Sequence, residues 1–306
     1  MKYHILVLYF SQTGQLRDII DRVLLEMGAQ CVIEFKQIEP EKPFSFPWNA
    51  YDFFDCMPES VQLIPEPIHP IHTDREDYDL VILGWQPWFL SPSIPITSFL
   101  KSSYANILKG KRVLTICGSR NMWLNAHEQI KNQLQQLEAK HYGHLVFFDR
   151  NSNLTSVLTV IRWTFKGRKE ASSWLPEAGV QKNDIAAASR FGQPILDILQ
   201  SGQWDIMQKK LLDQQGIELK PGLIVLEKRA IKNFRKFSMF ILERGQRGDL
   251  SRKSRVFLFK RLLLVGVFIL SPVSQLIGKL QLVLNHRKLE EEVEYFKNLR
   301  YRENAL

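Results

Sequence analysis

Short runs of apolar residues alternate with helical patterns along the first half of the chain. The runs cover residues 3–10, 30–35, 79–85, 111–117 and 143–149. Continuous apolar runs of this length are typical of strands buried on both faces of a parallel sheet. Between the first two runs, apolar residues recur at helical spacing from Leu16 to Met27. The alternation predicts an α/β domain over residues 1–150, with a doubly wound, five-stranded parallel sheet in the order 2-1-3-4-5.

The loop after the first strand, Ser11 to Gln15, contains two hydroxyl groups and one glycine and leads directly into the first helix. Backbone N–H groups at the start of a helix, together with the helix dipole, bind anions such as phosphate. The spacing matches neither the three glycines of a dinucleotide fingerprint nor the Gly-Lys-Ser/Thr end of a Walker loop. The loop therefore favours a single phosphate, and the alternative is that it only caps the helix.

The letters SQTGQL, residues 11–16, resemble the FMN phosphate loop of flavodoxin-like proteins, with Leu16 in the place of the last hydroxyl residue. The resemblance implies that the domain binds FMN. Ligands of doubly wound sheets bind beyond the carboxyl ends of the strands, where a tryptophan can stack against a flat ring. The expected cofactor-binding residues are Ser11, Gln12, Thr13, Gly14, Gln15, Trp85, Gln86, Pro87, Trp88, Gly118, Ser119 and Asn121.

Residues 40–70 form an insertion that is rich in both proline and aromatic residues. Proline excludes regular structure over most of it, so that only a short helix near residues 49–57 is expected. The aromatic content is too high for a free linker. Because a long, irregular and apolar loop in a compact domain is more often functional than not, we expect a lid over the cofactor. The alternative is a structural cover for a sheet edge.

The positive charge of the chain is concentrated in its last part. Residues 228–306 contain 18 Lys and Arg but 7 Asp and Glu. Their longest uncharged stretch, residues 262–278, has 17 residues and lies at the lower limit for crossing a bilayer. Cations flank it on both sides, without the asymmetry of a spanning helix. Long Leu, Val and Phe runs suit lipid better than nucleic acid, so no nucleic-acid partner is expected.

We therefore expect three parts: the domain with its lid, a helical extension packed on it over residues 151–227, and a membrane-associating tail over residues 228–306. The tail would lie in or re-enter the membrane, and an ordinary buried helix is the alternative. Three widely spaced cysteines provide neither a disulfide framework nor a metal pair, so no metal site is expected. The sequence enters a strand at once, without the basic and apolar pattern of a signal peptide, so secretion is not expected. The pattern predicts a location on the cytoplasmic side of the inner membrane, peripheral or monotopic.

A narrower resemblance covers most of the chain. The segments LGWQPWFLSPSIPITSFL, GSRNMW and DRNSNLTSVLTVIRW, with the basic and apolar C-terminus, look like the flavodoxin-like dialkylresorcinol condensing enzymes, or aromatases. These belong to bacterial dialkylresorcinol and flexirubin-type pigment biosynthesis. The resemblance implies that a ketosynthase-type condensing enzyme makes a 2,5-dialkylcyclohexane-1,3-dione. This protein, with FMN, would then oxidise the apolar dialkyl ring to a dialkylresorcinol.

Aromatisation removes two electrons and two protons from the ring. An oxidised flavin accepts a hydride, a protein base takes a proton, and a cation stabilises the enolate. The candidate cations are Arg120 and Arg162, and the candidate bases are Asp52, Asp55 and His127. Two other functions stay open: a membrane-associated NAD(P)H quinone reductase, and a non-catalytic electron carrier or scaffold.

Overall fold

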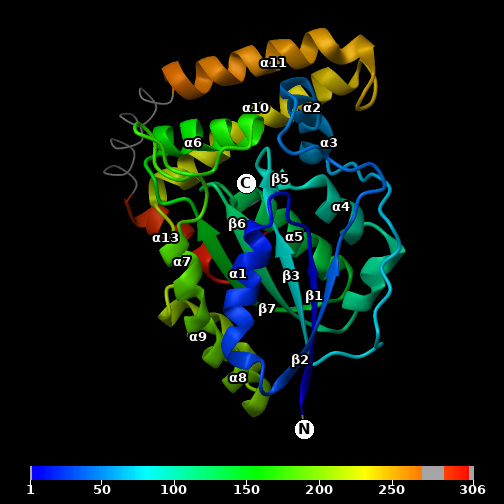
Figure 1. Ribbon diagram of the computed structural model, residues 1–306, viewed down its shortest axis with the longest axis vertical. Helices are drawn as coiled ribbons and strands as arrows, with labels where there is room; N and C mark the ends of the chain where they lie inside the picture. The colour runs from blue at the N-terminus through cyan, green and yellow to red at the C-terminus, as the bar shows by residue number, and fades with distance from the viewer. Residues whose placement is uncertain (1, 271–285, 303–306) are drawn as a thin grey trace.

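A five-stranded parallel sheet lies at the centre of the computed structural model, which describes residues 2–270 and 286–302 (Figure 1). Its strands are β1 (Tyr3–Tyr9), β2 (Cys31–Gln37), β3 (Leu80–Trp85), β6 (Arg112–Ser119) and β7 (Lys140–Phe148). They pair in the order β2-β1-β3-β6-β7, and every pair is parallel. The predicted order is confirmed, and the fold is flavodoxin-like. A separate antiparallel ribbon, β4 (Pro87–Trp88) and β5 (Ser91–Pro92), follows β3.

Helices cover both faces of the sheet because the strands are apolar on both sides. In β1, Ile5 and Val7 face one hydrophobic core, and Leu6 and Leu8 face the other. The first core is covered by α1 (Gln15–Leu24), η1 (Leu25–Met27), α7 (Lys182–Ala186), η3 (Ala187–Phe191), α8 (Gly192–Ser201), η4 (Trp204–Ile206) and α9 (Met207–Asp213). The second is covered by α4 (Ile94–Leu100), η2 (Ser103–Leu108), α5 (Leu124–Gln136) and α13 (His286–Lys297).

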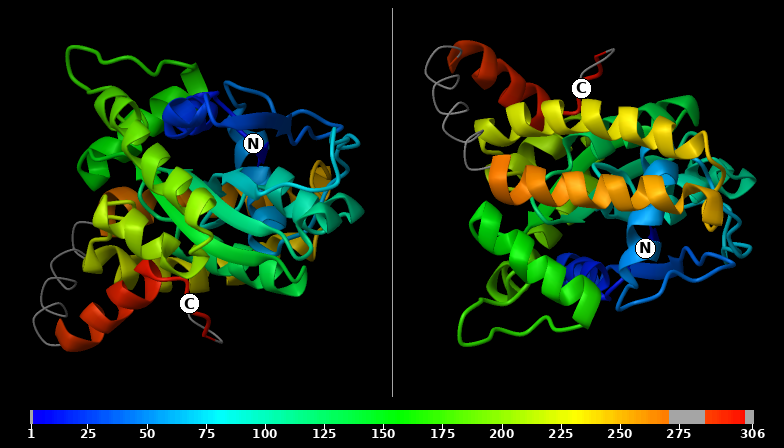
Figure 2. Two further views of the ribbon diagram at one scale, coloured as in Figure 1. Left: turned by 90° about the horizontal axis from the view of Figure 1, so that it is seen from below. Right: turned by 90° about the horizontal axis from the view of Figure 1, so that it is seen from above.

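A third group of helices covers the edge of the sheet where the strands end. It comprises α2 (Ala50–Asp55), α3 (Met57–Val61), α6 (Asn153–Lys166), α10 (Pro221–Leu242), η5 (Leu250–Arg252), α11 (Lys253–Val265) and the π-helical turn η6 (Gly266–Leu270). Figures 1 and 2 show α11 outermost, with α10 and α6 on either side of it and nearer the sheet. Phe54 and Met57 of the lid pack against Ile231 of α10 and Phe259 of α11 in a hydrophobic cluster of their own. The lid and the tail helices therefore share a core.

The shared core corrects the expected division of the chain. The boundary expected between residues 227 and 228 falls inside α10, so the tail is not a separate unit at that point. The apolar segment 262–278 lies partly outside the described residues. Within residues 2–270 and 286–302, no helix combines the length and the apolar character needed to span a bilayer.

Gly84 supports a testable prediction about the packing of α1 on β3. A methyl group at Gly84 would lie 2.5 Å from Ile20 Cδ1 and 2.9 Å from Tyr9 Cβ. We expect Gly84→Ala to lower the free energy of unfolding by about 1–3 kcal/mol, the usual cost of overpacking. Urea denaturation followed by circular dichroism measures it. Gly28→Ala is the matched control, because a methyl group there meets an atom only at 3.8 Å. Equal stability of the two variants would contradict this packing.

Candidate functional site

The loop between β1 and α1 has the backbone geometry of an anion site. Gly14 caps α1 in a left-handed conformation, with φ of 82°, and a Cβ built on it would meet nothing within 4 Å. Thr13 and Gly14 are exposed at the start of the helix, where amide groups and the helix dipole favour an anion. Ser11 Oγ is buried and has no hydrogen-bond partner within the described part of the chain. An unpartnered hydroxyl beside open backbone amides fits the phosphate of a mononucleotide.

The two glutamines of this loop hold neighbouring segments. Gln12 Nε2 donates to the carbonyl of Phe44 at 3.0 Å, and the Gln12 N–H donates to Gln86 Oε1 at 3.4 Å. Gln15 is buried, and its side chain makes two hydrogen bonds with the backbone of Val180, each of 3.0 Å. The amide of Gln15 therefore fixes the segment that precedes α7. The side chain of Gln15 is therefore occupied, and the predicted contact of Gln15 with a phosphate is left to its backbone N–H.

The loop after β6 carries the main candidate cation. A Cβ on Gly118 would lie 3.4 Å from Leu16 in the first turn of α1, so the start of α1 packs against the end of β6. Arg120 Nη1 donates to Asn153 Oδ1 at 2.9 Å, and Asn121 Nδ2 donates to the same oxygen at 3.1 Å. Asn153, at the start of α6, thus holds both side chains. In residues 2–270 and 286–302, Ser119 Oγ and Asn121 Oδ1 are buried without a hydrogen-bond partner.

Arg120 is a fixed positive charge. Burial lowers its pKa to about 10, while the nearby carboxylates of Asp149 and Glu227 act in the opposite direction. The guanidinium therefore stays protonated at neutral pH. Arg162 lies nine residues beyond Asn153 on α6, about 13 Å along the helix, and donates to the carbonyl of Glu170. Arg162, the second candidate cation, therefore does not lie beside Arg120.

The lid is closed over Trp88. The Trp88 ring is half-buried and makes edge contacts, with ring centres 4.9 to 5.7 Å apart, with Phe10, Phe44 and Trp48. Such contacts contribute about 0.5–1.5 kcal/mol each beyond the burial of area. The Trp48 N–H also donates to the carbonyl of Thr164 in α6 at 2.8 Å. A flat ring could stack on Trp88 only after this part of the lid had moved.

Two predicted site residues lie in the core below the loops. Trp85 is 0% exposed and His127 is 1% exposed. The two rings are nearly parallel with centres 6.2 Å apart, and His127 stacks on His144 at 3.6 Å. Burial, reinforced by the neighbouring histidines, holds the pKa of His127 well below its usual value, so that its ring is neutral. Trp85 as a stacking surface and His127 as a base are therefore both wrong.

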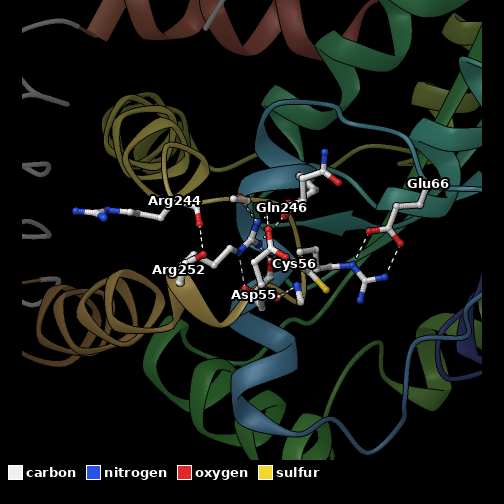
Figure 3. A network of polar contacts seen from close by, with 12 residues as sticks. Asp55, Cys56, Glu66, Arg244, Gln246 and Arg252 are labelled. Atoms are coloured by element: carbon white, nitrogen blue, oxygen red, sulfur yellow. Dashed lines mark hydrogen bonds and ion pairs between the residues drawn. The ribbon is translucent and has the colours of Figure 1, made fainter.

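Asp55 belongs to a buried ion cluster between the lid and the tail (Figure 3). The guanidinium of Arg252 donates to Asp55 Oδ1 at 2.7 Å and to Glu59 Oε1 at 2.6 Å. The N–H of Gly248 donates to Asp55 Oδ2 at 2.8 Å. Both carboxylate oxygens of Asp55 are engaged, so its expected role as a base is wrong. Asp52 is exposed on α2 and remains a candidate base.

Glu227 of α10 packs against the start of α5, near Arg120, and the sequence analysis did not identify it. The side chain is fully buried, and its Oε1 accepts the N–H of Asn125 in the first turn of α5 at 2.8 Å. Burial raises its pKa to about 7, although the amide groups of α5 and the charge of Arg120 act against this. The sequence feature that could have identified it is an acidic residue between Ile224 and Ile231 on the apolar face of a helix.

A recess beside the end of β7 lies outside this site. It is lined by Phe148, Arg150, Asp184 and Glu218, among others. Arg150 pairs with Asp184 at 2.9 Å and with Glu218 at 2.6 Å. These charges satisfy one another, so the recess is an ion-paired surface and not a second candidate site.

Comparisons with known proteins find solved structures of flavodoxins and other flavoproteins at low similarity. No protein-family model and no curated protein matches the chain. A flavoprotein in complex with FMN from Lactobacillus acidophilus is 18% identical over 47% of this chain and 93% of that one, with a TM-score of 0.39. A WrbA-like flavodoxin from Agrobacterium tumefaciens is 13% identical over 65% and 99%, with a TM-score of 0.35. A flavodoxin from Megasphaera elsdenii is 16% identical over 46% and 84%, with a TM-score of 0.29. At these identities the likeness concerns the fold alone.

The raised pKa of Glu227 predicts that the stability of the protein depends on pH. This raised pKa means that the folded protein holds the proton more tightly than the unfolded chain. The contribution of Glu227 to the free energy of unfolding therefore falls as the pH rises from 4.5 to about 7. Glu227→Gln keeps an acceptor for Asn125 and removes the charge. We expect the variant to be more stable than the wild type by on the order of 1–3 kcal/mol above about pH 8, and equally stable near pH 4.5.

Thermal unfolding at the two pH values measures this difference. Glu76→Gln is the control, because Glu76 is exposed and its replacement should leave the pH profile of the wild type unchanged. A Glu227→Gln protein that is less stable than the wild type at high pH would show that the charged form is favoured at this place.

Proposed function

We propose that this chain is a flavoprotein that binds one FMN. The observation that carries the proposal is the open, left-handed cap of α1 at Gly14, in a loop that also holds Ser11 Oγ, a buried oxygen without a hydrogen-bond partner in the described residues. Buried polar atoms are nearly always hydrogen-bonded in folded proteins. This oxygen and the open cradle at Gly14 fit one phosphate, and Ser119 Oγ and Asn121 Oδ1, at the end of β6, offer further polar atoms to the same ligand. The single cradle at the start of α1 suits FMN better than FAD.

The site residues divide by the part of FMN that each would hold. The phosphate would contact Ser11, Gln12, Thr13 and the backbone of Gly14. The polar edge of the ring would meet Gly118, Ser119 and Asn121, and its flat face would lie near Gln86, Pro87 and Trp88. Because the lid covers Trp88, binding requires the lid to open first. This requirement predicts slow binding of a cofactor that is then well shielded from water.

The proposed reaction is the oxidation of a 2,5-dialkylcyclohexane-1,3-dione to a dialkylresorcinol. Bound FMN would supply the acceptor for a hydride from the ring. Arg120, held by Asn153, provides a preorganised cation for the enolate oxygen. The aromatic lid excludes water and offers an apolar surface to the two alkyl chains. With Asp55 engaged by Arg252 and His127 buried in the core, Asp52 is the remaining candidate for taking up the proton.

The closed lid favours this proposal over an electron carrier, which leaves the edge of its flavin open to partners. A quinone reductase would use the same site with electrons flowing in the opposite direction. A ketosynthase-type condensing enzyme is the proposed supplier of the dione. Each CH₂ of the alkyl chains contributes about 0.8 kcal/mol toward leaving water. The proposed place of work is therefore the cytoplasmic side of the inner membrane, with the protein peripheral or monotopic.

The cradle at Gly14 can be tested by adding a negative charge. Asp tolerates the left-handed backbone, and at the start of α1 it is favourable for the helix. Gly14→Asp should lose on the order of 1 kcal/mol of stability to backbone strain at this positive φ and should bind FMN at least about tenfold more weakly, because its carboxylate repels the phosphate. Gly14→Asn, which has the same size without the charge, should lose much less affinity. Titration of flavin fluorescence measures both.

Gly202→Asp is the matched control, because Gly202 has φ of 69° and an equally open surround at the other end of the molecule, after α8. It should bind FMN as the wild type does. Equal affinity of Gly14→Asp and the wild type would place the phosphate elsewhere.

The reaction can be tested under anaerobic conditions with the FMN-loaded protein. A 2,5-dialkylcyclohexane-1,3-dione should bleach the flavin and yield the resorcinol. Arg120→Ala should slow bleaching by about 10²-fold, the usual cost of removing one oxyanion donor, with little change in FMN affinity. Arg120→Lys should recover part of the rate, and Arg162→Ala should resemble the wild type. Bleaching by NADPH without any response to diones would instead support the quinone reductase. Equal losses of FMN and rate in Arg120→Ala would remove Arg120 from the chemistry.

A further inference from the structure

Helix α11 is apolar on both of its sides. Its inner side packs into the core shared with the lid, where Val256 and Phe259 are buried. Its outer side exposes four large apolar residues by 38 to 45%: Phe257, Leu258, Leu262 and Val265. Large apolar side chains that are exposed together on one side of a helix usually mark an interaction surface. The outer side of α11 therefore marks a contact with an apolar partner.

The position of α11 leaves this outer side free to meet a large, flat partner. Figures 1 and 2 show the helix as the outermost element at the end of the molecule that carries the lid. The turn η6 continues the exposed apolar surface with Phe268, which is 37% exposed. Beyond it, the sequence contains no charged residue as far as Gly278. Among the described residues, the exposed apolar surface therefore runs from Phe257 to Phe268, along the axis of α11.

Cations lie on the same outer side. Lys253 and Arg261 are exposed at positions that share a helix face with Phe257 and Leu258, and the ammonium of Lys253 also lies 5.7 Å from the centre of the Tyr51 ring in the lid. Two copies of α11 packed on each other would confine these like charges in one interface, which is unfavourable. Anionic lipid headgroups would neutralise them, because the long side chains can keep their stems among apolar groups and their charged ends at the headgroups.

We propose that the outer side of α11 lies on an anionic lipid bilayer, with the helix axis in the membrane plane. Thirteen residues of α-helix extend about 20 Å, which is shorter than the hydrocarbon core of about 30 Å. An in-plane helix with an apolar side and flanking cations is the usual form of an interfacial anchor. The sequence pattern favoured in-plane burial for the tail as a whole, and the structure points to the specific surface.

The surface adjoins the lid directly. Phe257 contacts the ring of Tyr51 in α2 with centres 5.9 Å apart, and Phe259 contacts Phe54 at 6.3 Å. A bilayer under α11 would therefore bring lipid-dissolved molecules to the outer edge of the lid. The lipid contact rests on α11 alone. The passage of a dialkyl ring from the bilayer to the site rests in addition on the proposed function.

Sedimentation of the full chain with vesicles tests the lipid contact. Vesicles of phosphatidylcholine with phosphatidylglycerol should bind the protein, and pure phosphatidylcholine should bind it less. Replacing Leu258, Leu262 and Val265 together by Ser should weaken binding at least about thirtyfold. The matched control replaces three exposed apolar residues elsewhere, Leu25, Val32 and Ile64, by Ser, and should bind as the wild type does.

The electrostatic part has a separate test. Replacing Lys253 and Arg261 by Gln should weaken binding about tenfold at low salt and hardly at all at high salt. Circular dichroism and FMN binding should be unchanged in all variants, so that a failure of lipid binding is distinguished from a failure of the flavin site. Absence of vesicle binding by the wild type would overturn the proposal. So would a self-association, detected by analytical ultracentrifugation, that the three Ser substitutions abolish while vesicle binding persists.

Discussion

One buried guanidinium, that of Arg252, holds the lid over the site. It is 0% exposed and lies between the carboxylates of Asp55 in α2 and Glu59 in α3. Taking three charges out of water is costly, and removal of one partner from a buried ion cluster typically costs about 3–5 kcal/mol. The cluster is therefore stable only when lid and tail are both in place. This constraint makes residues 50–61 and the start of α11 a single folded unit, although about 190 residues separate them in the chain.

The closed lid limits the kind of chemistry that the site can support. With the lid held by Arg252 on one side and by the contact of Trp48 with α6 on the other, Trp88 is enclosed by aromatic rings. An apolar, water-poor enclosure strengthens the field of a fixed cation such as Arg120. Such an enclosure is consistent with the proposed hydrophobic ring substrate. The same unit carries α11 on its outer side, the surface that we propose lies on a lipid bilayer.

The sequence could predict the sheet because buried parallel strands are continuous apolar runs, and their order follows from the rules of right-handed crossovers. It could also predict which loops lie at the carboxyl ends of the strands. It could not predict that Trp85 points into the core, because a strand buried on both faces has no polar alternation to distinguish one side from the other. The roles of Gln15 and Glu227 could not be predicted for another reason: their partners, Val180 and Asn125, are over one hundred residues away in the sequence. The average basicity of the tail likewise hid the fact that Arg252 is an interior residue.

Calorimetric titration of the full chain with FMN and with riboflavin tests whether the loop before α1 holds a flavin by its phosphate. Riboflavin has the same ring and lacks the phosphate, so every other contact is shared. We expect one FMN per chain and an affinity for riboflavin about a hundredfold lower, since hydrogen bonds to a charged group contribute about 1.5–3 kcal/mol each. Equal affinity for the two ligands, or binding of neither, would contradict it.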